Sequence, residues 1–253
     1  MSIIYKIMIN IFAVVGGVWH ILWGTLKRLP QTWRSRRLIV DQIRHLGLGS
    51  IPIIAPTFFF AGAVVAYEAK FYGGGMFPEI YIGMFTAKAL MIEIAPLLTG
   101  IMFAGRAGSS MAAEIATMRV TEQIDALETL AIDPLRFISL PRFVSSIIVV
   151  PLLTLIANFV GFIGGLFCAK VFFNVTAITY IEGLRLNFIP REFWGGLVKS
   201  TFFGMWTAVM SVYYGFTATG GAEGVGRAST RAVISSSILI IVFDLVVAMT
   251  IFR

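Results

Sequence analysis

Long apolar segments constrain the fold of this chain more than any other feature. After the first 50 residues, four of them are good candidates for membrane spans and a fifth is interrupted by charge. They cover about residues 51–72, 80–104, 143–173, 194–216 and 233–252. A spanning helix needs roughly 20 apolar residues, and these runs lack the ten-residue alternation of barrel strands. We therefore predict an all-α integral membrane protein, with residues 51–252 forming a five-helix transmembrane bundle.

The composition agrees with a membrane protein. Hydrophobic residues make up 58% of the chain and charged residues 13%, against about 25% charged in soluble domains. The net charge of +7 is interpreted as a topology signal, because the basic residues lie beside the apolar runs and show no basic-aromatic pattern typical of nucleic-acid binding. Cys168, His20 and His45 are isolated from one another, so neither a disulfide framework nor a metal site or other cofactor is expected.

The basic residues also predict the orientation of the chain. The segment before the first span carries six of them against one acid, Asp41. They are Lys27, Arg28, Arg34, Arg36, Arg37 and Arg44. The positive-inside rule places this segment in the cytoplasm. Counting spans from there puts residues 105–142 and 217–232 inside as well, and residues 73–79 and 174–193 outside.

The N-terminal segment 7–26 is open to two interpretations. It carries no charge over 20 residues, so its hydropathy is compatible with a sixth span. It also contains Trp19 and Trp23, together with several glycines, and tryptophan prefers the membrane interface. A helix lying in the plane of the interface is the competing prediction.

An amphipathic helix is predicted over residues 121–132, between a Thr121 N-cap and the helix-stopping Pro134. At 100° per residue its apolar and acidic side chains take opposite faces. The apolar face holds Ile124, Leu127, Leu130 and Ala131, and the acidic face holds Glu122, Asp125 and Glu128. We call this segment the coupling helix.

Two environments suit the coupling helix, a solvated loop or a separate protein. A helix this short is marginal in water unless it packs on something, and its acidic face would be repelled by an anionic leaflet. A protein partner with a basic groove satisfies both conditions, as when an ABC permease receives force from its ATPase. The chain itself lacks a phosphate loop, because Val198 stands in "WGGLVKST" where the motif requires glycine. We therefore expect a membrane subunit that is not an enzyme, with ATP hydrolysis in a partner chain.

The segment "FAGRAGSSMAAEIATMRVTEQIDALETLAIDPLRFISLPRF" strongly resembles the MlaE family of ABC permeases. The similarity runs from about residue 35 to the C-terminus, is dense from Glu93 to Phe143, and returns at "KSTFFG" and "GVGRASTRAVISSS". These permeases are the membrane subunits of phospholipid transporters that work with MCE-domain proteins.

The resemblance implies a single permease domain over residues 1–253 that forms a homodimer. It implies five transmembrane helices plus an N-terminal interfacial helix, with residues 1–45 comprising that helix and the basic cytoplasmic segment. It also implies an ABC ATPase, often a STAS-domain subunit, and a periplasmic MCE-domain subunit. The expected activity is movement of phospholipid between the bacterial inner membrane and the MCE protein, in support of outer-membrane lipid asymmetry.

Ionisable residues within spans are costly and are candidates for function. Here they are Glu68, Lys88, Glu93, Lys199 and Asp244. Span position puts Glu68, Lys88 and Lys199 in the outer half and the other two deeper. The alternative role is structural, as buried pairs that fix helix register or as lysines that snorkel to the interface. The structural role is favoured for Asp244. For Glu93 and Lys199 a functional role is favoured, because they match polar positions at the family's lipid cavity.

The resulting hypothesis is a lipid site enclosed by two protomers and lined by the first, second and fifth spans. Apolar walls would hold acyl chains; they include Phe58, Phe59, Val64 and Val65. Lys199 and Lys88 would attract the phosphate, with Glu93 and Glu68 completing the substrate-binding set. Some family members carry an arginine before the glutamate where this chain has Ile92, and Lys88 is a candidate for the missing charge.

Three alternatives accompany this hypothesis. The cargo could be another lipid or a sterol. The intramembrane lysines and glutamates could instead form the relay of an ion-coupled secondary transporter. That alternative would predict inverted repeats and broken helices, and the sequence indicates neither. A non-transporting scaffold for an MCE protein would not need a cytoplasmic coupling helix.

Overall fold

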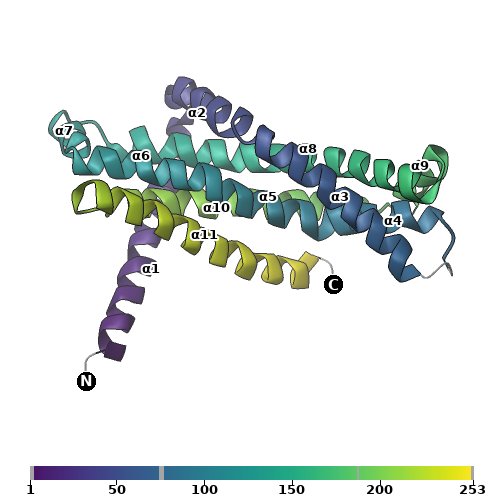
Figure 1. The fold of residues 1–253 in the computed structure, drawn as a ribbon. Helices are drawn as coiled ribbons and strands as arrows, with labels where there is room; N and C mark the ends of the chain where they lie inside the picture. The colour runs from purple at the N-terminus through teal and green to yellow at the C-terminus, as the bar shows by residue number, and fades with distance from the viewer. Residues whose placement is uncertain (1–2, 74–76, 187, 252–253) are drawn as a thin grey trace.

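The protein is an elongated helical bundle, described here by a computed structural model that covers residues 3–73, 77–186 and 188–251. Figure 1 shows α7 at one end of the bundle and α4 and α9 at the other. The described residues contain no strand, which confirms the prediction of an all-α protein. The chain is thus a multi-pass membrane protein built from helices.

The long helices run lengthwise through the bundle. They are α3 (Ile51–Gly73), α8 (Leu140–Phe173), α10 (Pro190–Phe216) and α11 (Gly221–Ile251). A fifth long helix runs in sections from α4 (Ile80–Ala89) through η2 (Leu90–Ile94), α5 (Ala95–Phe103) and η3 (Ala104–Gly108) to α6 (Ser109–Val120). The remaining elements are α1 (Ile3–Lys27), η1 (Leu29–Ser35), α2 (Arg36–Leu48), α7 (Gln123–Thr129), η4 (Leu135–Ser139) and α9 (Ala177–Arg185).

Four helices of the described chain are long and apolar enough to cross a membrane. They are Ile51–Gly73, Ile80–Val120, Leu135–Phe173 and Gly221–Thr250. The first three contain the expected segments 51–72, 80–104 and 143–173, and the fourth covers residues 233–250 of the expected segment 233–252. The second has 41 residues and is therefore about 60 Å long at 1.5 Å per residue, twice the roughly 30 Å hydrocarbon core. Part of it must lie outside the bilayer.

Helix α10 is less apolar than these four because it packs in the middle of the bundle. It contacts α8, α11 and α6, and its buried residues include Lys199, Ser200, Thr207 and Ser211. Polar side chains can be accommodated there because neighbouring helices, rather than lipid, surround them. That α10 is a fifth span remains a prediction.

Close packing of α3 on α8 depends on glycine. A Cβ atom at Gly62 would lie 1.9 Å from the carbonyl oxygen of Gly161, and one at Gly164 would lie 1.8 Å from that of Phe59. No side chain fits at these distances, so the two backbones touch directly. Small residues allow this approach in membrane helices, where van der Waals packing drives association.

Three π-helical sections, η2, η3 and η4, interrupt the α-helices. At η2 the cause is local, because Pro96 has no N–H to donate and the Ala95 N–H bonds to the carbonyl of Leu90, five residues earlier. Such bulges often occur at functional sites. Glu93 lies in this one.

Helix α1 leaves the bundle and stands across its long axis (Figure 1). Its C-terminal half is anchored by Val18, Ile21 and Leu22, which are buried against residues of η4, α8 and α10, and by a 2.7 Å hydrogen bond between the Thr25 and Ser139 hydroxyls. Trp19 and Trp23 face outward as a stacked pair. This direction is compatible with a helix in the membrane plane, which stays a prediction.

The coupling helix is shorter than its predicted range of 121–132, since α7 covers Gln123–Thr129. The predicted Thr121 cap is wrong. Its hydroxyl bonds to the carbonyl of Thr117, while Glu122 precedes the helix with a left-handed φ of 59°. A sharp turn, rather than a side-chain cap, thus starts α7.

Candidate functional site

An ion cluster joins three helices inside the bundle. The Lys199 ammonium lies 2.6 Å from Glu93 Oε2 and 2.8 Å from Asp244 Oδ1. Glu93 comes from η2, Lys199 from α10 and Asp244 from α11. The structure therefore brings together Glu93 and Lys199, two predicted site residues. Their charged groups meet although span position put Lys199 in the outer half and its two acidic partners deeper.

Burial within the cluster is uneven. The Lys199 side chain is 0% exposed and that of Asp244 10%, whereas that of Glu93 is 43% exposed. A charge removed from water needs a partner, and removing one member of such a pair costs about 3–5 kcal/mol. Lys199 and Asp244 therefore form the fixed part of the cluster, and Glu93 is the member that a ligand can reach.

Lys88 lies apart from this cluster and binds Glu192 instead. Its ammonium is 2.9 Å and 3.2 Å from the two carboxylate oxygens of Glu192 at the start of α10. No ion pair joins Lys88 to Glu93, so the structure does not support the suggestion that Lys88 supplies a missing positive charge beside Glu93. Glu192 was not predicted, although an acid two residues after Pro190, in the first turn of α10, is a usable signal.

Glu68 lines an apolar hollow between α3 and α4, far from α7. The hollow has a volume of about 290 Å³. Its lining consists of Val65, Glu68, Ala69, Tyr72, Gly73, Phe77, Phe85 and Ala89. Of the predicted apolar wall, Val65 lines this hollow, but Phe58 is wholly buried in the core and cannot.

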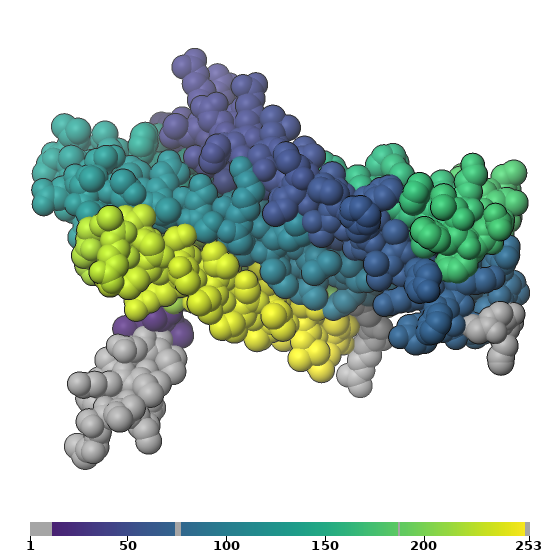
Figure 2. Space-filling model, viewed as in Figure 1, coloured from purple at the N-terminus to yellow at the C-terminus, as the bar shows by residue number. Residues whose placement is uncertain are grey.

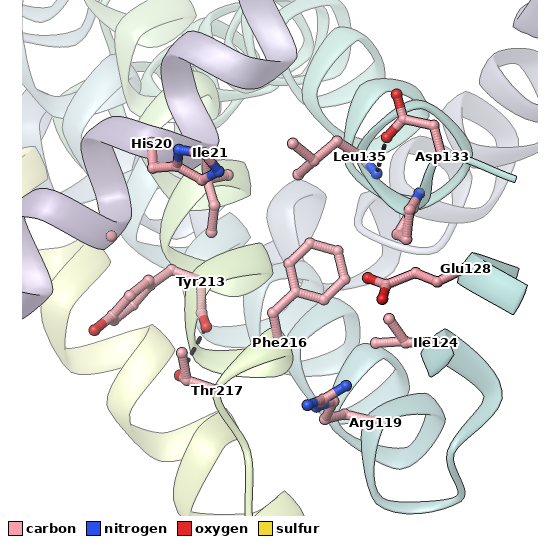
Figure 3. A pocket seen from close by; sticks show the side chains of 12 residues that line it. His20, Ile21, Arg119, Ile124, Glu128, Asp133, Leu135, Tyr213, Phe216 and Thr217 are labelled. Carbon is pink, nitrogen blue, oxygen red and sulfur yellow. Dashed lines mark hydrogen bonds between the residues drawn. The ribbon is translucent and has the colours of Figure 1, made fainter. Parts of the chain in front are cut away.

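A larger groove, drawn in Figure 3, lies beside α7 at the other end of the bundle. We call it the coupling groove. Its volume is about 510 Å³. Its lining consists of Gly17, His20, Ile21, Arg119, Ile124, Glu128, Asp133, Pro134, Leu135, Tyr213, Phe216 and Thr217. Glu128 of α7 and Arg119 of α6 reach it from different helices, so it carries charges of both signs.

The residues predicted to couple to an ATPase occupy different positions on α7. Leu127 is half-buried and packs with Ile124 against the α1, α8 and α10 cluster. Asp125 accepts a hydrogen bond from Arg119. Glu122 and Glu128 are exposed, and Leu130 is 69% exposed. The available contact surface thus combines Glu122, Glu128 and Leu130, while Leu127 holds the helix on the bundle.

Comparison with known proteins gives a consistent result. The family model described as Permease MlaE matches residues 39–250. The chain belongs to this family. A probable ABC transporter permease of Rickettsia conorii is 39% identical to this chain, and the match covers 85% of this chain and 83% of the Rickettsia protein. A probable ABC transporter permease of Synechocystis is 34% identical, covering 100% and 94%.

The MlaE protein of Haemophilus influenzae is 29% identical over 99% of this chain and 97% of its own. It is called the permease protein of an intermembrane phospholipid transport system. The MlaE family assignment makes this chain an ABC permease, a membrane component rather than an enzyme. An ABC permease implies an ATPase partner, and membership of the MlaE family suggests an MCE-domain partner.

Proposed function

We propose that this permease moves phospholipids between the bacterial inner membrane and a periplasmic MCE-domain protein, and so supports outer-membrane lipid asymmetry. The observation that carries the proposal is the similarity to the Haemophilus intermembrane phospholipid permease over nearly the whole chain. The apolar hollow beside Glu68 adds support, because an acyl chain requires such a surface.

The proposed lipid path uses the outer half of the bundle. Acyl chains would contact the apolar hollow around Val65 and Phe85. Glu93, the accessible member of the ion cluster, would adjust the cluster as lipid enters, and Lys199 would attract the phosphate only after loosening from its two carboxylates. Lys88 and Glu68 complete the proposed substrate-binding set. Two protomers would enclose this path as a homodimer.

Force would enter at α7. The surface formed by Glu122, Glu128 and Leu130 would dock on an ATPase dimer, with a STAS-domain subunit beside it. Because Ile124 and Leu127 pack on the cluster that includes α10, displacement of α7 would reach α10 and the Lys199 it carries.

The test is a mild-detergent purification of the full chain, followed by mass spectrometry of bound proteins and lipids. We expect an ATPase, an MCE-domain chain and phospholipid to accompany it. ATP-dependent lipid transfer would then be measured for Glu93→Gln in the reconstituted complex, with Glu182→Gln on the surface of α9 as the matched control. Unchanged lipid transfer by the Glu93→Gln variant would refute the assignment of Glu93 to the lipid site. Sterol bound in place of phospholipid would identify sterol as the cargo.

The ion cluster also supports a second candidate, an ion-coupled secondary transporter. Three ionisable side chains meeting among helices is the arrangement of a proton relay. This candidate predicts transport driven by a pH gradient without ATP. A purified chain that carries no ATPase and responds to such a gradient would favour it over the ABC permease mechanism.

A further inference from the structure

A second groove shares Asp133 with the coupling groove but opens between η1, the start of α2 and residues 131–137. Its volume is about 560 Å³. Its lining consists of Gln31, Arg34, Ser35, Leu38, Ala131, Ile132, Asp133, Arg136 and Phe137. We call it the arginine groove.

The arginine groove is positively charged. Arg34 and Arg136 line it, and neither has a carboxylate within ion-pair distance among the described residues. Its acid, Asp133, is bound by Arg28, which lies outside the lining. Two guanidinium groups are thus available, and guanidinium is suited to two-pronged hydrogen bonding with a phosphate.

Apolar side chains stand beside these guanidinium groups. Leu38, Ile132 and Phe137 line the same groove and are 36%, 40% and 43% exposed. A small free anion would gain no favourable contact from these apolar side chains. The combination of paired arginines with an apolar flank fits an amphipathic anion, which has a charged head and hydrocarbon chains.

The chain leading to the groove has the character of a membrane-interface segment. The Lys27 ammonium lies 5.6 Å from the ring centre of Trp23, and the Arg36 guanidinium lies 5.1 Å from that of Trp33. Residues 12–40 contain no acid, and Trp33 is 75% exposed. Exposed tryptophans interleaved with basic residues are typical of the boundary between lipid and water, where anionic leaflets attract such segments.

We propose that the arginine groove binds the headgroup phosphate of an anionic phospholipid from the cytoplasmic leaflet. The phosphate would lie between Arg34 and Arg136, with hydrocarbon along Leu38 and Phe137. This lipid would stay bound to the permease and would link η1 and α2 to residues 131–137, the connection that follows α7. It differs from transported lipid, which is proposed to enter through the hollow at Glu68 at the other end of the bundle.

The experiment uses the full chain in nanodiscs of phosphatidylcholine, with and without phosphatidylglycerol, and measures the melting temperature and the phosphatidylglycerol retained in native mass spectrometry. The variants are Arg34→Gln, Arg34→Lys and Arg34→Gln combined with Arg136→Gln. The matched control is Arg185→Gln combined with Arg191→Gln, since these exposed arginines lie at the opposite end of the bundle.

We expect phosphatidylglycerol to raise the melting temperature of the parent and of the control. Arg34→Gln should retain it about tenfold more weakly, because a hydrogen bond to a charged group is lost, and Arg34→Lys should be intermediate. Arg34 is exposed, so its replacement leaves folding intact. Equal retention by all variants would overturn the proposal.

Two further results would also overturn it. If inorganic phosphate alone raises the melting temperature as much as phosphatidylglycerol does, the groove is a site for free anions. If Arg34→Gln retains phosphatidylglycerol but loses a co-purifying ATPase, the groove is a protein contact. Absence of phospholipid transfer by the parent complex, with normal retention of phosphatidylglycerol, would count against the proposed transport function and leave the proposed resident lipid supported.

Discussion

The charge of Lys199 is held by residues that lie far from it in the sequence. Its partner Glu93 is 106 residues away, and the second carboxylate comes from Asp244 on another helix. Each of the three side chains would be unfavourable alone in a membrane. Together they connect the π-helical bulge at η2 with α10 and α11, so the same atoms hold the helices in register and form the candidate site.

Replacing Lys199 with methionine should destabilise the protein strongly. The change keeps a long side chain but leaves Glu93 and Asp244 facing each other without the cation, at a cost of about 3–5 kcal/mol. Thermal unfolding in detergent measures the effect, and Lys170→Met, at an exposed position of α8, is the control. Equal melting temperatures for the two variants would show that the cluster contributes no stability.

The same cluster shows what a single sequence can and cannot predict. Glu93, Lys199 and Asp244 were recognisable as unusual because each interrupts an apolar run. Which of them meet was not predictable, because it depends on how three helices rotate about their axes and on the extra residue in the η2 turn. Lys88 illustrates this, because it lies only five residues from Glu93 in the sequence but pairs with Glu192 on another helix.

At the scale of helices, four of the apolar runs fall in helices long and apolar enough to span a membrane, because lipid requires about 20 apolar residues wherever a helix faces it. Helix α10 departs from that pattern since other helices cover it. The start of α7 was also missed, because the left-handed Glu122 leaves no signature of the kind that a glycine would.

The contact between α3 and α8 gives a prediction at this scale. Gly62→Ala should separate the two helices and lower the melting temperature by several degrees, because the new Cβ would lie 1.9 Å from the carbonyl oxygen of Gly161. Gly226→Ala on α11 is the control, since its Cβ would have nothing within 4 Å and alanine favours helix. A Gly62→Ala protein as stable as Gly226→Ala would mean that α3 and α8 are not held this closely.

Considered as a whole molecule, the bundle presents different surfaces at its two ends and along its side. Figure 2 shows α11 lying along the near face of the bundle. Its exposed side chains include Ile234, Ile238, Ile241, Leu245 and Val246, a surface suited to lipid or to a second protomer. The end that carries α7 is instead charged and grooved, which suits a water-soluble partner.

The two ends make matched test sites for partner binding. Leu130 beside α7 is 69% exposed and Ile178 on α9 is 70% exposed, so replacing either with aspartate should leave stability nearly unchanged. If the ATPase docks on α7, Leu130→Asp should weaken its co-purification and ATP-driven lipid transfer about tenfold or more, since an exposed apolar anchor becomes a charge among acids. The Ile178→Asp variant should retain both ATPase co-purification and ATP-driven lipid transfer. Equal ATPase recovery for the two variants would place the docking surface elsewhere, and the coupling groove would then be the next region to mutate.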